Sequence, residues 1–419
     1  MIFEQFRESL YTKGYSGKTI AVKRKELLQG LTTFQAHIRY TIGKNRRDDG
    51  LYHAYNTFSL DKDGGVQIHY LDEMLEGQVA VLSSRALSGT EALGVFKALR
   101  SSRMFREDQY SYMLYPEKEL PHFLQKNCVQ RKDVESIPLL QRMLENGDPR
   151  IIKIDSHGIA HFNGAFRNAK DLEAVLHVLQ AQASQAQTSQ QGNSDLAALA
   201  KQDAPAVLDL YERTFNHRSF TGRSGSFYAY EGLGSIYWHM VSKLLLAIQE
   251  NVLWEQDPPV RQELIAAYYD VRKGLGFNKT PDVYGAFPTD PYSHTPAGQG
   301  AKQPGMTGQV KEEVLTRWGE LGIKIENGCL HFNPMLLKRE EFFEDRSLEF
   351  TYCGIPVRYE RTNTNTGSIH VYQAGSGGVE TLIQDGLVLN ESLSRRVFMR
   401  DAGIQRILVK LPQTINLQQ

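Results

Sequence analysis

The sequence lacks several features that would place it in a common class of protein. Its 419 residues include only three cysteines, Cys128, Cys329 and Cys353. An odd number outside metal-ligand spacing argues against a disulfide framework and indicates reduced thiols, so we expect a cytoplasmic protein. No apolar run is long enough to span a membrane. The first residues also lack the apolar core of a secretory signal.

An excess of charge of one sign is also absent. Forty-eight Lys and Arg residues balance forty-eight Asp and Glu residues. No overall field would draw the chain to nucleic acid or to an anionic membrane, so we expect neither as a partner. The Walker phosphate loop, the Rossmann glycine fingerprint, HExxH and GxSxG are missing too. The sequence therefore gives no motif support for nucleotide, dinucleotide, zinc-protease or serine-esterase chemistry.

Apolar spacing divides the chain into a helical part and a β part. Amphipathic patterns recur through the first part, and one of them begins with a capping box of Ser88 and Glu91. From Ile323 onwards, short alternating runs follow one another as in a β-sandwich. The sequence therefore predicts two domains, 1–322 and 323–419. The first is mainly α, of the (α/α)6 helical-barrel type, and the second is a small C-terminal β-sandwich.

The predicted barrel is short of helices. We count about eight helical patterns, which is too few for six hairpins, so we expect the barrel to lack its first helices. Between two of these patterns, IIKIDSHGIAHFNG alternates in the manner of a hairpin around His157 and Gly158.

The most unusual segment runs from Gly274 to Gln309 and is rich in glycine, proline and aromatic residues. A loop of roughly thirty residues is uncommon unless it is functional or disordered, and disordered segments are poor in aromatics. We interpret it as a binding loop. It ends where Thr307 and Gly308 open a helix, and free N–H groups at a helix start suit an anion. A plain N-cap would explain Thr307 but not the length of the loop.

An acidic turn, Arg46-Arg47-Asp48-Asp49-Gly50, is a candidate for acid catalysis. If the arginines hold one carboxylate, the other is left to face a cleft. Burial beside aromatic residues would raise its pKa toward the range that a general acid needs. A solvated turn is the simpler alternative, because Asp-Asp-Gly is common in loops, and composition alone favours it.

Two further segments have the residue types of a sugar-binding cleft. Arg223, Tyr230 and Glu231 lie in a run of aromatic and arginine residues, and flat rings and forked donors suit sugars or phosphates. An ordinary helix entry, with Glu231 in the first turn, explains them about as well. Glu76-Gly77-Gln78 is retained as a segment that lines a cleft, although acids at a helix start usually serve the dipole.

Taken in order, these segments resemble glycoside hydrolase family 94 and its relatives, families 149 and 161, which are inverting disaccharide and β-glucan phosphorylases. The resemblance is strongest from PDVYGAFPTDPYSH through PGMTGQVKEEVLTRWGELGI to ENGCLHFNPMLL. It includes GSFYAYEGLGSIYWHM and, more weakly, RRDDGLYHAYN. It implies cleavage of β-linked gluco-oligosaccharides with inorganic phosphate, inversion, a sugar 1-phosphate product, and no cofactor or metal.

The resemblance also implies a role for each candidate residue. Asp49 is then the general acid, because it is the second acid of the pair, as in the family's Asp-Trp-Asn-Asp pattern. One acid suffices, since phosphate is already a competent nucleophile and replaces the second carboxylate of a hydrolase. The substrate-binding residues would be Asp48, Arg223, Tyr230 and Glu231. The phosphate-binding residues would be His294, Thr307, Gly308 and Gln309. The sequence departs from the family pattern at Arg46-Arg47-Asp48, where Asp-Trp-Asn is usual, and at Gln309, where serine is usual.

Two alternatives stay open. An inverting hydrolase would need a second carboxylate roughly 6.5 to 9.5 Å from Asp49, with Glu231 or Asp290 as candidates. A non-catalytic carbohydrate-binding fragment would need no catalytic group. In either case the chain resembles the C-terminal part of a longer enzyme, for which a homodimer is one expected state.

Overall fold

The structure is a computed structural model that describes residues 2–15, 17–61, 64–71, 73–117, 121–181, 191–217, 234–375 and 378–418. Contacts divide the chain into two compact units, one of Met1–Tyr115 with Ile236–Gln419 and one of Pro116–Ser235. They do not divide it at the predicted boundary between residues 322 and 323. Met113 and Ile236 form an antiparallel bridge within the first unit. The second unit is therefore inserted between two neighbouring points of the first.

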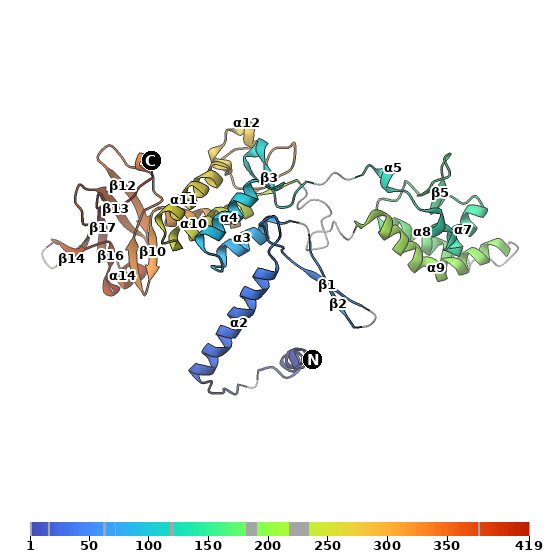
Figure 1. The fold of residues 1–419 in the computed structure, drawn as a ribbon, viewed down its shortest axis with the longest axis horizontal. Helices are drawn as coiled ribbons and strands as arrows, with labels where there is room; N and C mark the ends of the chain where they lie inside the picture. The colour runs from blue at the N-terminus through green and yellow to red at the C-terminus, as the bar shows by residue number, and fades with distance from the viewer. Residues whose placement is uncertain are drawn as a thin grey trace. The chain divides into compact units, whose positions relative to one another are not determined.

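Five helices pack together in the body of the first unit (Figure 1). Their bounds are α3 Leu75–Ser83, α4 Gly89–Arg100, α10 Trp238–Trp254, α11 Pro258–Lys273 and α13 Thr307–Glu320. The connections from α3 to α4 and from α10 to α11 are short, which makes each pair an antiparallel hairpin. The predicted capping box at the start of α4 is confirmed, because Ser88 and Glu91 bond each other's backbone N–H groups.

Polar contacts fix the direction of the inner helices. Near the end of α10, Asn251 donates to the carbonyl of Leu82 near the end of α3 at 2.9 Å. At the other end, His239 of α10 lies 3.5 Å from Glu312 in the first turns of α13. The helices α3, α10 and α13 are therefore parallel and begin at the same end of the body. The described helices are too few to close six hairpins, so the (α/α)6 barrel stays a prediction.

The outer helices of the two hairpins are parallel as well. Lys97 of α4 pairs with Glu263 of α11 at 2.7 Å, and Arg100 lies 3.4 Å from Asp270. One core fills the space between the hairpins, and α10 contributes most to it, with eleven of its seventeen residues buried. Trp238, Leu244 and Tyr268 in this core are fully buried.

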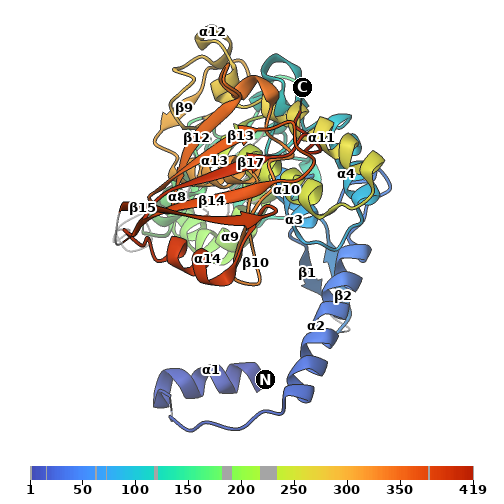
Figure 2. The same ribbon diagram turned by 90° about the vertical axis from the view of Figure 1, so that its left-hand side faces the viewer.

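Two sheets follow the helical body. The small antiparallel sheet has the order β10-β11-β16, and the larger one β12-β13-β17-β14-β15, in which β13 and β17 are parallel. Figure 2 shows the five strands side by side. Both sheets and helix α14 contribute to a second core around Tyr359. The bounds are β10 Ile323–Glu326, β11 Cys329–Phe332, β12 Ser347–Tyr352, β13 Ile355–Arg361, β14 Ser368–Gly375, β15 Gly378–Asp385, β16 Val388–Leu389, α14 Glu391–Phe398 and β17 Ile404–Leu411.

The predicted change from helices to strands at Ile323 is confirmed, because β10 begins there. A parallel pair of strands needs a crossover, and the chain between β13 and β17 supplies it with the β14–β15 hairpin and α14. A β-sandwich as the class of this region stays a prediction.

The start of the first unit projects from the body (Figure 1). It consists of α1 Ile2–Lys13, α2 Arg24–Lys44 and the hairpin of β1 Thr57–Leu60 with β2 Val66–His69. Helix α2 has no buried residue, and every residue of both strands is exposed. None of the described helices is long and apolar enough to cross a bilayer.

The second unit has its own core of helices around a small hairpin. The predicted hairpin at His157 and Gly158 is confirmed, because Ile152 pairs with Phe162 across it. The buried carboxylate of Asp203 accepts from Leu139 N at 2.8 Å and so caps a helix start. The bounds are α5 Phe123–Lys126, α6 Arg131–Glu135, α7 Pro138–Glu145, β5 Ile152–Ile154, β6 Ala160–Phe162, α8 Ala169–Ala181 and α9 Gln191–Phe215.

The segment from Gly274 to Gln309 is more regular than the predicted loop. Its four short elements before α13 are η4 Gly276–Asn278, α12 Pro281–Tyr284, β8 Tyr292–Thr295 and β9 Lys302–Pro304. The two strands form because β8 pairs with β9 and with β7 Ile236–Tyr237, a partner far away in sequence that local periodicity does not reveal. A second small hairpin, β3 Phe105–Arg106 with β4 Ser111–Tyr112, lies next to β7 through the bridge at Met113.

Separate cores predict separate unfolding transitions. Leu140 lies in the core of the second unit and Leu244 in the core of the body, and both are fully buried. Each Leu→Ala change removes about 2–5 kcal/mol from its own core. In calorimetry, we expect Leu140→Ala to lower one transition temperature and Leu244→Ala the other. If either change moved both transitions equally, the two units would unfold as one.

Candidate functional site

A three-stranded sheet, β7-β8-β9, lies at the end of the body where α10 and α13 begin. Strand β7 leads directly into α10, and β9 leads through Gly305 and Met306 into α13. Tyr237 and His294 are paired in register, and their rings stack with centroids 4.9 Å apart. The sheet thus holds His294 beside the first residues of α10.

Side chains from β7, β8, α10 and α13 meet here in what we call the helix-start cluster. It consists of Tyr237, His239, Ser242, His294, Gly308, Gln309, Glu312 and Glu313. The hydroxyl of Tyr237 lies 3.5 Å from Nδ1 of His239, and Nε2 of His239 lies 3.5 Å from Glu312. A Cβ on Gly308 would lie only 2.6 Å from the ring of His239, so glycine is what lets α13 approach α10 this closely.

The structure brings some of the predicted phosphate residues together. The ring of His294 stacks on Tyr237, the hydroxyl of Tyr237 lies near His239, and the ring of His239 lies close to Gly308. Thr307 is the first residue of α13. The side chain of Thr307 lies outside the described residues. The alternative that Thr307 is the N-cap is wrong, because Met306 holds that position and gives no side-chain hydrogen bond. A helix start without a side-chain cap leaves N–H donors for a ligand.

The side chain of Gln309 is turned toward Glu313 within α13. It is buried, and its amide nitrogen donates to Glu313 one turn later at 2.9 Å. Its carbonyl oxygen has no partner among the described residues. The Gln309 side chain is thus engaged within α13, and its backbone N–H lies at the helix start.

The cluster contains acidic groups that the sequence did not single out. Burial raises the pKa of Glu313, while Gln309 and Ser242 donate to it and lower the pKa by less. Burial also lowers the pKa of His239, partly offset by Glu312. Glu313 therefore keeps its proton to a higher pH than an exposed glutamate, and His239 loses its proton at a lower pH. The sequence signal for Glu313 was its position in the first turns of the helix that follows the predicted binding loop.

The acidic turn has a different environment from the predicted one. Arg47 grips the carboxylate of Asp49 from Nε at 3.1 Å and from its terminal nitrogen at 2.8 Å, and Leu51 N donates to it at 3.1 Å. The Arg47 hydrogen bonds are the main reason that the pKa of Asp49 is lowered. The expectation that aromatic burial raises this pKa is wrong for this structure. Asp48 is exposed on the same turn.

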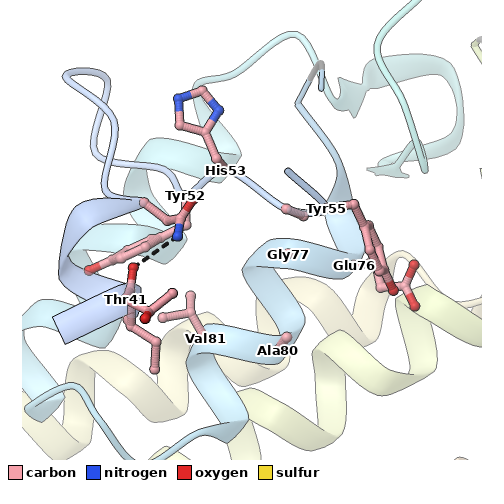
Figure 3. Close-up of a pocket in the computed structure, with 11 residues that line it drawn as sticks. Thr41, Tyr52, His53, Tyr55, Glu76, Gly77, Ala80 and Val81 are labelled. Carbon is pink, nitrogen blue, oxygen red and sulfur yellow. Dashed lines mark hydrogen bonds between the residues drawn. The ribbon is translucent and has the colours of Figure 1, made fainter. Parts of the chain in front are cut away.

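A pocket of about 370 Å³ lies between the end of α2, residues 52–55, which follow the acidic turn, and α3 (Figure 3). Glu76 and Gly77 line it, which confirms the prediction of a cleft-lining segment for these two residues, whereas the fully buried Gln78 is not among the lining residues. Its apolar surface comes from Ile42, Ala80 and Val81. A pocket of this size is in the range of small-ligand sites.

His53 brings an imidazole to the same pocket. It stacks on Tyr70 with ring centroids 4.1 Å apart, and its buried Nδ1 has no partner among the described residues. Burial is the main cause that lowers its pKa, followed by Arg47. Glu73 accepts from both Arg47 and Arg103 at 2.9 Å, which holds Arg47 between two carboxylates.

The acidic turn is fastened to the start of α3. The amide of Gln78 accepts from Tyr52 N at 2.9 Å and donates to Tyr52 O at 2.8 Å. Asp49 therefore lies at the end of the body where α3, α10 and α13 begin. The pocket is lined by the end of α2, Asn45, residues 52–55 and α3, and no residue of the acidic turn is among these lining residues. A cavity shared by Asp49 and the start of α13 stays a prediction.

The remaining candidates from the sequence are not part of the helix-start cluster as described. Arg223, Tyr230 and Glu231 fall outside the described residues, and Asp290 is exposed just before β8. Within the part of the chain that the structure describes, no group of three His, Cys, Asp or Glu side chains is arranged to hold a metal ion.

A half-buried lysine, Lys279, lies against Trp238 at the start of α10, which follows β7 in the sheet of the cluster. Lys279 donates to Gly274 O, and its nitrogen lies 4.5 Å from the ring centre of Trp238. Trp238 in turn donates to Thr295 of β8 at 2.9 Å, and Arg106 donates to the Thr295 carbonyl at 2.8 Å. Burial, with a smaller contribution from Arg106, lowers the pKa of Lys279 from its usual 10.5 to about 7.

A comparison with protein-family models gives a match within the second unit. Residues 120–218 match the family model described as GH149 phosphorylase insertion domain 2. They lie inside the second unit, 116–235, which the contacts separate as an insertion. No curated protein matches the chain. The match supports a relation to GH149-type phosphorylases, and it gives no such support for families 94 and 161.

Gly308 offers a test of the close approach of α13. In Gly308→Ala, the added methyl group would meet the ring of His239, and we expect a loss of about 1–3 kcal/mol in the free energy of unfolding. Gly94 is the control, because it lies in the exposed interior of α4 with nothing within 4 Å of an added Cβ. Gly94→Ala should gain up to about 1 kcal/mol in a denaturant titration. Equal effects of the two changes would contradict the close approach.

Lys279 makes stability depend on pH. Its folded pKa is about 7 against the usual 10.5, so between these values the unfolded chain binds more protons. Stability should then rise with pH by about 1.4 kcal/mol per pH unit. We expect this slope in the difference between the unfolding free energies of the wild type and Lys279→Met, measured from pH 7 to 10. A flat difference would mean that Lys279 is charged in the folded protein.

Proposed function

We propose that the chain is part of a glycoside phosphorylase that cleaves β-linked gluco-oligosaccharides with inorganic phosphate, giving a sugar 1-phosphate with inversion. The observation that carries the proposal is the match of residues 120–218 to a phosphorylase insertion domain. The match falls on a unit that is an insertion in this structure too. A cytoplasmic location, a homodimer, the (α/α)6 barrel and the β-sandwich belong to the same proposal.

The proposed phosphate site is the start of α13. Three parallel helices begin at this end of the body, and each contributes the positive end of its dipole. Thr307, Gly308 and Gln309 offer backbone N–H groups without a side-chain cap, and His294 offers an imidazole held by Tyr237. Donors placed in advance around the phosphate stabilise the charge that shifts in the transition state.

The proposed general acid is Asp49. In this structure Arg47 keeps it ionised, so proton donation requires Arg47 to move. Glu73 already binds the same terminal nitrogen of Arg47 at 2.9 Å, which gives Arg47 a second partner once a sugar displaces it. Asp48 is proposed to contact the sugar from the same turn. Arg223, Tyr230 and Glu231 stay in the proposal as sugar contacts from outside the described residues.

Glu313 supports the second candidate function, an inverting hydrolase. It is a carboxyl group with a raised pKa that accepts from Gln309 and Ser242, at the helix start where the phosphate is proposed. A hydrolase would use one carboxyl as acid and another as base for water. The two functions differ in one reagent, inorganic phosphate.

The assay follows release of sugar 1-phosphate from β-linked gluco-oligosaccharides, with and without inorganic phosphate. We expect release only with phosphate, and a loss of about 10²–10⁴-fold in Asp49→Asn, since this is the usual contribution of a general acid. Asp48→Asn is the matched control and should retain most of kcat, because it removes a sugar contact and not the proton donor.

Three outcomes would contradict the proposal in different ways. Free sugar released without phosphate would identify a hydrolase, and Glu313→Gln would then be the variant that loses activity. Oligosaccharide binding in calorimetry without turnover would identify a binding module. Equal activity in Asp49→Asn and the wild type would remove Asp49 from the acid role.

A further inference from the structure

A second pocket lies away from the helix-start cluster, at the junction between the helical body and the strands. Its volume is about 550 Å³. It is formed by the last turns of α11, the turn at Asn278, Lys338 and Gln418 near the end of the chain. We call it the junction pocket. The proposed phosphorylase reaction makes no use of it.

The charge of the junction pocket is of one sign. Arg272, Lys273 and Lys338 line it, and no carboxylate is among its lining residues. Cations in the last turn of a helix commonly serve the dipole, and this explains Arg272 and Lys273 at the end of α11. It does not explain Lys338, which comes from a separate segment and lies 5.2 Å from the ring centre of Tyr269 in the same pocket.

These cations retain donors for a ligand. Arg272 uses Nε to bind Glu320 at 2.8 Å, and no described residue accepts from its two terminal nitrogens. Lys273 has no ion pair with any described residue. Lys338 pairs at 3.0 Å with Glu340, whose side chain is 70% exposed, so solvent already weakens this pair.

The walls are fixed from three segments before a ligand arrives. The hydroxyl of Tyr269 donates to Leu336 O, and Lys338 pairs with Gln418 in a parallel bridge. Gln418 also donates to Met335 O at 2.7 Å. The ring of Tyr269 and the side chain of Ile265 provide an apolar surface beside the cations.

We infer that the junction pocket binds a small phosphate monoester, with its phosphate among Arg272, Lys273 and Lys338 and its organic part against Tyr269. Arginine and lysine together suit a doubly charged phosphate, which accepts several charge-assisted hydrogen bonds. The volume and the apolar surface leave room for more than the phosphate itself. The inference does not depend on the proposed function.

The test is lysine acylation of the whole chain, read by mass spectrometry one lysine at a time. The probes are glucose 1-phosphate, inorganic phosphate and glucose, each at the same ionic strength. We expect glucose 1-phosphate to slow the acylation of Lys273 and Lys338 several-fold and glucose to leave it unchanged. Lys201 is the internal control, because it is exposed on α9 in the second unit. This readout separates the junction pocket from the helix-start cluster.

A matched pair of variants completes the test. Lys273→Glu changes an exposed residue and should abolish protection of Lys338 and weaken glucose 1-phosphate binding at this site by about tenfold or more. Lys201→Glu should change neither. The inference is overturned if Lys273 and Lys338 are not protected, or if Lys273→Glu leaves the protection of Lys338 intact. Equal protection by inorganic phosphate would also overturn it, by showing a site for free phosphate.

Discussion

The packing of α10 between α3 and α13 is the constraint on which the site depends. Its apolar length is buried, and two amides fix its position along the axis. Asn251 donates to α3, and Gln249 donates to Thr316 O of α13 at 2.8 Å. Because buried amides need their partners, neither neighbour can slide along α10. The first residues of α3, α10 and α13 are therefore held at the same end of the body, and the side chains of α10 and α13 lie close together there.

Local signals in the sequence predicted local features well. Ser88 and Glu91 announced a helix start, His157 and Gly158 a hairpin, and Thr307 the first residue of α13. Each of these depends on neighbours within a few positions. The pairing of β7 with β8 could not be predicted in this way, because Tyr237 and His294 are distant in sequence.

The chemistry of the carboxylates was also beyond the sequence. The family resemblance implied that Asp49 is the acid, yet its pKa is lowered by the guanidinium of Arg47, two positions earlier. Nothing in the sequence singled out Glu313, whose pKa is raised by burial. In both cases the direction of the pKa shift depends on the nearest groups in space, and only tertiary packing determines which groups these are.

The bridge between Met113 and Ile236 has a consequence for how such a protein changes over time. Where a chain leaves a domain and returns to it at adjacent points, the inserted segment can have almost any length without disturbing that domain. Gene segments could be exchanged at this position without disturbing the strand register on either side. The bridge therefore marks a site where another domain can be inserted, and an engineered fusion could replace the present second unit there.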